Sequence, residues 1–159
     1  MSRLPALGRR GEGWFALQLV LMGLVALAGW LLGPDWDGVL LVLSIGLGSA
    51  LVAAGAVAGV LGIYGLGSSL SPWPYPPPGG QLVQTGAYAY VRHPIYVGVI
   101  AASVGWALLS ASVVALALAV LLSLVLDLKA RREEAWLVEH YPGYRTYARR
   151  VKRFLPGVY

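Results

Sequence analysis

Long apolar runs, separated by short polar segments, make up most of this chain. The first covers residues 14–32 and the second residues 39–64, and a third extends from residue 95 to residue 126. Each run approaches or exceeds the roughly 20 apolar residues that an α-helix needs to cross a bilayer. Trp14 and Trp30 lie near the two ends of the first run, as expected of aromatic side chains at a membrane interface. The pattern therefore predicts transmembrane helices at 14–32 and 39–64.

The third apolar run is too long for one crossing. As a single helix, residues 95–126 would measure about 48 Å, whereas the hydrocarbon core is about 30 Å thick. The segment Ser110-Ala111-Ser112 is the best polar break within it. We therefore predict a hairpin of two helices, 95–109 and 113–128. The result is an all-α integral membrane protein with about four transmembrane helices, in which residues 1–159 form a single membrane domain.

The segments outside these runs have distinct characters. Residues 65–94 are predicted to be a connecting loop, because the prolines between Pro72 and Pro78 lack backbone donors and disfavour helix. After Lys129 the sequence predicts a helix that leaves the membrane, a turn at Pro142-Gly143, and a second, basic amphipathic helix ending before Pro156. Residues 129–156 are thus expected to form cytoplasmic C-terminal helices.

Composition and charge agree with this interpretation. The chain is 58% hydrophobic and 12% charged, about half the charged fraction of a soluble domain. No Asp, Glu, Lys or Arg occurs in 38–91 or in 93–126. The absence of cysteine excludes disulfides, thiolate metal ligands and cysteine nucleophiles, and no metal site is predicted.

The basic residues lie mostly near the two ends of the chain. Arg3, Arg9 and Arg10 precede the first apolar run, and eight of the twelve basic residues follow Asp127. The positive-inside rule places both termini in the cytoplasm. Membrane topology and anionic lipid explain this charge, so no nucleic-acid partner is expected.

The second apolar run carries small residues at helix-packing spacing. Gly55 and Gly59 form a GxxxG pattern, which allows close approach of another helix. That helix could belong to the same chain, or the face could form the seam of a homo-oligomer. The spacing does not choose between them.

Two polar clusters could carry chemistry. Arg92-His93-Pro94 precedes the predicted hairpin and Glu133-Glu134 follows it, so the hairpin brings both to one face of the membrane, together with Lys129, Tyr88 and Tyr96. Each residue also has a structural explanation. Arg92 could be an interfacial anchor, His93 an interfacial hydrogen bonder, and the glutamates helical ion-pair partners of Lys129 and Arg131.

Four segments resemble the isoprenylcysteine carboxyl methyltransferase family, whose outline the phospholipid methyltransferases share. They are LVQTGAY at 82–88, YVRHPIYVG at 90–98, REEAWL at 132–137 and YPGYRTY at 141–147. The resemblance covers roughly residues 80–156, and the combination RHPxYxG with a later EE is fairly specific. The N-terminal half is similar only in being transmembrane.

The resemblance implies an S-adenosylmethionine-dependent methyltransferase, releasing S-adenosylhomocysteine, with its site on the cytoplasmic face. A lipophilic, isoprenylcysteine-like substrate would enter from the bilayer, and Arg92 and Lys129 would orient its carboxylate. The cofactor-binding positions carried over are Gly80, Gln81, Leu82, Val83, Tyr88, His93, Pro94, Ile95, Tyr96, Glu133 and Glu134.

The sequence departs from the family pattern at two positions. Lys129 stands where the family has a substrate-contacting Arg, and a Lys ammonium lacks the planar fork that binds a carboxylate at two points. Ser112 stands where the family often has Asn. Two alternatives therefore accompany the carboxyl methyltransferase: an enzyme that methylates an amine or a phospholipid head group, and a non-catalytic membrane protein that only binds lipid.

Overall fold

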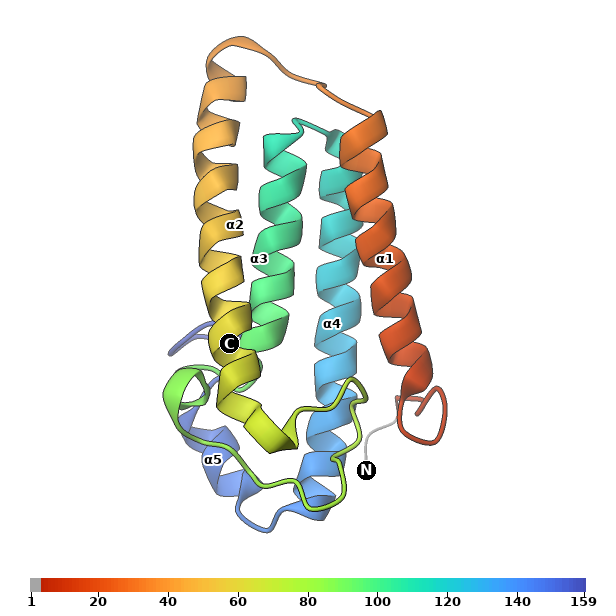
Figure 1. Ribbon diagram of the computed structural model, residues 1–159, viewed down its shortest axis with the longest axis vertical. Coiled ribbons are helices and arrows are strands. Elements are labelled where there is room, and N and C mark those ends of the chain that lie inside the picture. The colour runs from red at the N-terminus through yellow and green to blue at the C-terminus, as the bar shows by residue number, and fades with distance from the viewer. Residues whose placement is uncertain (1–3) are drawn as a thin grey trace.

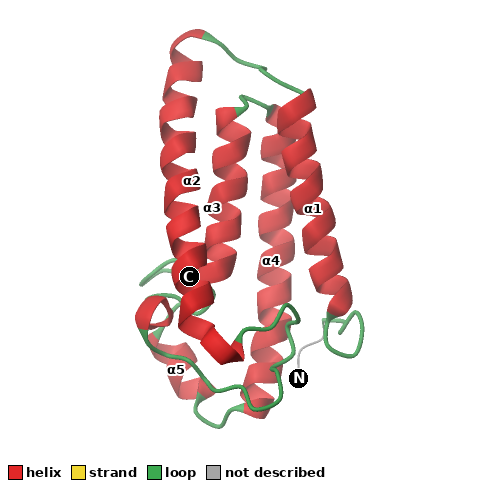
Figure 2. Cartoon of the chain, viewed as in Figure 1, coloured by secondary structure: helices red, strands yellow, loops and turns green. Residues whose placement is uncertain are grey.

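The computed structural model describes residues 4–159, so the prediction for Arg3 lies outside the described residues. The described part is helical, without a β-strand, as Figures 1 and 2 show. The helices are α1 (Glu12–Leu31), α2 (Gly38–Leu66), η1 (Gly67–Ser69), η2 (Gly86–Ala89), α3 (Pro94–Leu109), α4 (Val113–His140) and α5 (Tyr144–Arg150). The predicted fold class, an all-α integral membrane protein, is confirmed.

Helices α1, α2 and α4 are long and apolar enough to cross a membrane. Helix α3 is also apolar but has 16 residues, and its length of about 24 Å falls short of a 30 Å hydrocarbon core. Helix α4 continues well past the apolar run, to His140, so one helix carries both the predicted span 113–128 and the Glu133-Glu134 pair. The acidic pair is therefore held rigidly relative to the membrane helices.

A tight turn joins α3 and α4 at the predicted break. The Ser112 hydroxyl caps α4 by accepting a hydrogen bond from the backbone N–H of Ala115, at 3.2 Å. A carboxylate oxygen of Asp35, from the α1–α2 loop, accepts from the N–H of Val113 at 2.7 Å. These bonds satisfy N–H groups that the first turn of a helix leaves unpaired. The two helices run antiparallel, as Figure 1 shows.

Glycines bring α2 and α3 into close contact. A Cβ added at Gly55 would lie 2.7 Å from the carbonyl oxygen of Gly98, and one added at Gly48 would lie 2.7 Å from that of Gly105. Only glycine permits this backbone approach. Gly55 therefore packs within the chain, whereas a Cβ at Gly59 would meet no atom within 4 Å. An oligomer through the Gly55/Gly59 face stays a prediction.

Helix α1 lies against α4 at the other edge of the bundle, so that the helices follow the order α2, α3, α4, α1 in Figure 1. Buried Trp14 and Leu21 of α1 share a hydrophobic cluster with Leu122 and Leu126 of α4. This packing brings the start of α1 beside the second half of α4.

The chain after α5 differs from the prediction. The last helix ends at Arg150, well before Pro156, and Val151 is extended. The reason is a backbone pairing with the RHP segment: the N–H of Arg92 donates to Lys152 at 2.8 Å and that of His93 to Arg153 at 3.2 Å. Two consecutive N–H groups thus pair with two consecutive carbonyls of the segment after Val151, which is extended and not helical, so tertiary pairing overrides the amphipathic pattern.

Candidate active site

A cavity of about 440 Å³ lies at the end of the bundle where α1 begins and α2 ends. Its volume is within the range of small-molecule sites. All four long helices and the loop between α2 and α3 contribute to its lining. Helix residues in the lining include Phe15, Gln18, Ile63, Leu66, Ile95, Tyr96, Lys129, Glu133 and Leu137.

One polar wall of the cavity is formed by Glu133, Tyr96 and His93. The Tyr96 hydroxyl donates to Oε2 of Glu133 at 2.5 Å. The Tyr96 and His93 rings stack with centroids 5.1 Å apart, and Nδ1 of His93 lies 4.0 Å from the same Glu133 oxygen. Within the described residues the second oxygen of Glu133 has no hydrogen-bond partner. It can therefore accept a hydrogen bond from a ligand.

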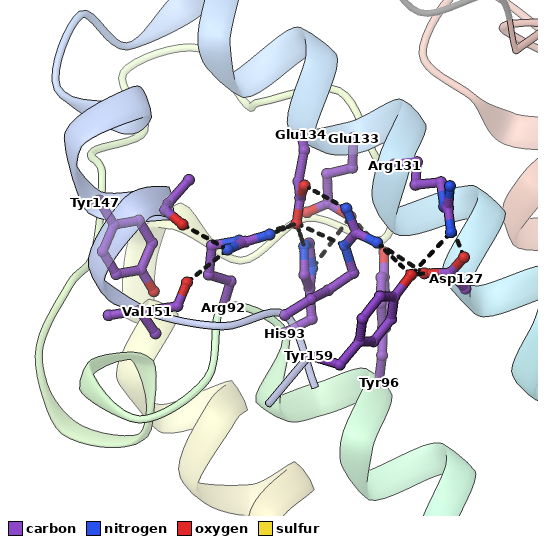
Figure 3. Close-up of polar contacts among 12 residues, drawn as sticks. Arg92, His93, Tyr96, Asp127, Arg131, Glu133, Glu134, Tyr147, Val151 and Tyr159 are labelled. Carbon is purple, nitrogen blue, oxygen red and sulfur yellow. Dashed lines mark hydrogen bonds and ion pairs between the residues drawn. The ribbon is translucent and has the colours of Figure 1, made fainter. Parts of the chain in front are cut away.

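The neighbouring Glu134 lies in a network of charged groups outside the cavity lining (Figure 3). Its Oε1 accepts from Arg92 at 2.8 Å and faces Nε2 of His93 at 3.1 Å, and its Oε2 accepts from Arg153 at 2.9 Å. Carboxylate–guanidinium hydrogen bonds of this kind are strong. Glu134 thus ties the RHP segment and the C-terminal segment to α4.

The guanidinium of Arg92 is engaged by the protein itself. Besides Glu134, it donates to the backbone carbonyls of Ala148, at 3.0 Å, and Val151, at 2.5 Å. Its side chain is only 10% exposed. Although Arg92 borders the cavity, its donors are directed mainly at α4 and at the residues around the end of α5.

Lys129 has a different environment. Its side chain is buried and lines the cavity, and its Nζ donates to the Gln18 amide oxygen of α1 at 2.6 Å. The rings of Tyr96 and Phe15 lie 4.9 and 5.5 Å from Nζ, within the range of cation–π attraction. No carboxylate lies within ion-pair distance of Nζ among residues 4–159.

The proline-rich segment also lines the cavity and packs on α1 and α4. Trp73 packs edge-to-face on Phe15 at 5.5 Å, and Tyr75 packs in the same way on Trp136 at 5.7 Å. The hydroxyl of Ser69 accepts from the N–H of Gln81 at 3.0 Å. An extended loop was predicted here, but its contribution to the cavity wall was not.

The residues that follow the proline-rich segment line the cavity, and two of them have unpaired backbone groups. Leu82 and Val83 are irregular and partly buried, and neither has a backbone hydrogen bond within the described residues. Such groups favour a bound partner, because buried backbone donors and acceptors are normally paired.

Three tyrosines complete this side. The Tyr147 hydroxyl donates to the carbonyl of Tyr88 at 2.6 Å, and the Tyr88 hydroxyl to the carbonyl of Gly62 at 3.3 Å. Burial raises the pKa of Tyr147 to about 12 and raises the pKa of Tyr88 and of Tyr144 further. All three hydroxyls therefore stay neutral at physiological pH.

Most of the residues predicted from the sequence come together here. The cavity is lined by Gln81, Leu82, Val83, Tyr88, Arg92, His93, Ile95, Tyr96, Lys129 and Glu133. Gly80, Pro94 and Glu134 lie outside that lining. Sequence reasoning missed Gln18 and Phe15. Gln18 is the one amide side chain in the apolar run 14–32, and that isolation was the available signal.

A family model described as phospholipid methyltransferase matches residues 43–143, which include most of α2 and all of α3 and α4. No curated protein matches the chain. The matched segment holds the RHP motif, Lys129 and both glutamates, and helix α1 lies outside it.

Proposed function

The chain belongs to the phospholipid methyltransferase family, and from this premise we propose which reaction it catalyses. It is a membrane methyltransferase that uses S-adenosylmethionine to esterify the carboxylate of a lipophilic, isoprenylcysteine-like acceptor. The site faces the cytoplasm and the acceptor enters from the bilayer. The observation that carries the carboxylate assignment is the buried ammonium of Lys129.

A buried charge is costly unless it is paired. Lys129 is 2% exposed, and its single hydrogen-bond partner is a neutral amide. The Glu133 carboxylate acts on this ammonium only from beyond ion-pair distance, and an acceptor carboxylate in the cavity would supply a direct negative partner. The same ammonium would repel a positively charged acceptor group.

The cavity residues fit S-adenosylmethionine, which supplies an electrophilic methyl group on sulfur when bound. The unpaired oxygen of Glu133 can accept from the cofactor's ammonium, and the free backbone of Leu82 and Val83 can pair with its adenine or amino-acid portion. Aromatic rings of the lining can pack near a sulfonium by cation–π attraction. Gly80, Gln81, Tyr88, Pro94 and Ile95 remain proposed cofactor-binding positions by family resemblance.

Carboxyl methylation requires this chain to orient the acceptor and to exclude water, but not to remove a proton. An ionised carboxylate already has the lone pair that forms the new O–C bond, so no general base is required. Lys129 would orient the carboxylate, and the apolar lining would exclude water; alignment and desolvation together can lower a barrier by several kcal/mol. We assign Arg92 and Glu134 to positioning, because their polar groups bind each other and the C-terminal segment.

A second candidate is N-methylation of a phospholipid head group. The family match is equally consistent with it, and a lipid phosphate is another anion that Lys129 could bind. The amine would first have to lose a proton. His93, the neighbouring candidate base, has its Nε2 3.1 Å from Glu134, which leaves Nδ1 for that task.

The two candidates differ in the stability of the product. Membranes containing the protein are incubated with methyl-labelled S-adenosylmethionine and either a farnesylcysteine analogue, a free fatty acid or phosphatidylethanolamine. Mild base then releases labelled methanol from a carboxyl ester but leaves an N-methyl group in place. We expect base-labile label with the farnesylcysteine analogue. Base-stable label on phosphatidylethanolamine alone would support the second candidate instead.

A further inference from the structure

We propose that Gln18 of α1 is a specificity-determining residue, which orients Lys129 and selects an acceptor with an anionic oxygen head group. The inference rests on the proposed function and deepens it. Gln18 lies outside the segment that matches the family, residues 43–143. The proposed selectivity therefore depends on the N-terminal helix α1, which the family model does not include.

Gln18 is placed unusually for a polar side chain. It is 7% exposed, lies in the apolar run 14–32 of helix α1 and lines the cavity. Polar side chains in membrane helices are rare and generally face the protein interior or a functional site. Packing alone explains a buried apolar residue at this position, but it does not explain an amide that reaches the Nζ of Lys129.

Among the described residues Lys129 has one bonded acceptor, the Gln18 amide oxygen, and the Glu133 carboxylate acts on its ammonium only at longer range. Its ammonium has three N–H groups, and Gln18 accepts one of them at 2.6 Å. The amide nitrogen of Gln18 has only the weak acceptor Met22 Sδ, at 3.7 Å. The rings of Tyr96 and Phe15 flank the ammonium without accepting a conventional hydrogen bond. The remaining N–H groups of Lys129 and Gln18 require acceptor oxygens, which a carboxylate or a phosphate provides.

The neutrality of Gln18 is central to this selection. An amide oxygen fixes the direction of the Lys129 side chain but adds no negative charge to that of Glu133, which acts on the ammonium only from beyond ion-pair distance. A glutamate of nearly the same shape would hold Lys129 in the same place and neutralise it. The variant Gln18→Glu therefore separates the positioning of Lys129 from its charge. The hydrogen bond between α1 and α4 is kept, but Lys129 no longer needs an anionic ligand to balance its charge.

The test uses purified protein in a neutral detergent and calorimetry with four twelve-carbon ligands: dodecanoate, dodecyl phosphate, dodecanol and dodecylammonium. We expect the wild type to bind at least one of the two anions about tenfold or more tightly than dodecanol, and to bind dodecylammonium most weakly. The dodecanoate and dodecyl phosphate arms distinguish a carboxylate acceptor from a phospholipid-like one.

Variants then assign the selectivity to Gln18. Gln18→Glu should abolish the preference for anions, and Gln18→Leu should weaken anion binding about tenfold, because Lys129 loses its orienting partner. Ser44→Ala, which removes a buried hydroxyl near the other end of the bundle, is the matched control and should keep wild-type selectivity. Ser44 is not among the residues that line the cavity, so Ser44→Ala should also keep S-adenosylhomocysteine affinity within about twofold of the wild type.

Two outcomes would overturn the inference while leaving the proposed function intact. The first is cofactor binding by a wild type that does not distinguish the anions from dodecanol. The second is unchanged anion preference in Gln18→Glu. Conversely, selectivity that depends on Gln18 in a protein that binds no S-adenosylhomocysteine would overturn the proposed function and retain Gln18 as an anion-selecting residue.

Discussion

At the scale of residues, adjacent glutamates on α4 have separate surroundings. Glu133 faces the cavity and accepts from Tyr96, whereas Glu134 binds Arg92, His93 and Arg153. Successive residues on a helix point about 100° apart. The Glu133 carboxylate can therefore bind a ligand, while that of Glu134 binds the segments packed against α4.

Replacing Glu134 should therefore destabilise the protein whether or not cofactor is present. Glu134→Gln removes the one carboxylate that pairs with part-buried Arg92 among the described residues, and one of the two that pair with Arg153, which keeps Asp127. Breaking one partner of a largely buried pair costs about 3 kcal/mol or more. Thermal unfolding followed by tryptophan fluorescence should show a transition several degrees lower. Glu139→Gln, at an exposed position of the same helix, is the control and should leave the transition unchanged. A wild-type transition in Glu134→Gln would contradict the fastening role.

At the scale of elements, the two contacts between helix pairs have different origins. Helices α2 and α3 meet through Gly48, Gly55, Gly98 and Gly105, whose backbones approach closely. Helices α1 and α4 meet through large apolar side chains. In lipid, where apolar side chains gain nothing by leaving the solvent, close backbone packing is a main source of helix association.

Enlarging one glycine should separate α2 from α3. A leucine at Gly55 would overlap the Gly98 carbonyl and Ala102, which over-packs the contact and costs about 1–3 kcal/mol or more. Gly59→Leu is the matched control, because its Cβ meets no atom within 4 Å. We expect a lower thermal transition for Gly55→Leu alone. If Gly59→Leu instead changes the oligomeric state in a cross-linking assay, that face is an interface between copies.

The elements also show how far the sequence could predict the structure. Apolar length and the Ser110-Ala111-Ser112 break were sufficient for the hairpin, because both are local properties of the chain. The end of α5 at Arg150 was not predictable in this way, since it depends on pairing with Arg92 and His93, about sixty residues earlier. Gln18 was missed for a similar reason: its partner Lys129 is 111 residues away.

At the scale of the whole molecule, the site depends on an even number of crossings between Ile95 and Leu126. The proposed topology places both termini and the 65–94 segment in the cytoplasm. The α3–α4 hairpin then returns Glu133 to the face that carries His93, and Figure 3 shows the two side chains close together. Helix α3 is short, so the surrounding bilayer would have to thin or α3 would have to lie beside longer helices.

Single cysteines test this topology in a protein that has none. A membrane-impermeant thiol reagent applied to intact cells should label Asp37→Cys, in the loop between α1 and α2 that the proposed topology places outside, and spare Gln84→Cys and Arg145→Cys. All three positions are exposed in the structure, so protection reports the membrane side and not burial. Labelling of Arg145→Cys with protection of Gln84→Cys would indicate a single crossing.

The central claim is that the cavity binds the methyl donor through Glu133, and calorimetry with S-adenosylhomocysteine tests it most directly. The detergent-solubilised wild type should bind this ligand, and Glu133→Gln should bind it about 10- to 100-fold more weakly, because a charge-assisted hydrogen bond to the ligand's ammonium is lost. The thermal transition of ligand-free Glu133→Gln should stay close to that of the wild type. No binding by the wild type at millimolar ligand, or equal affinity in the variant, would contradict this account.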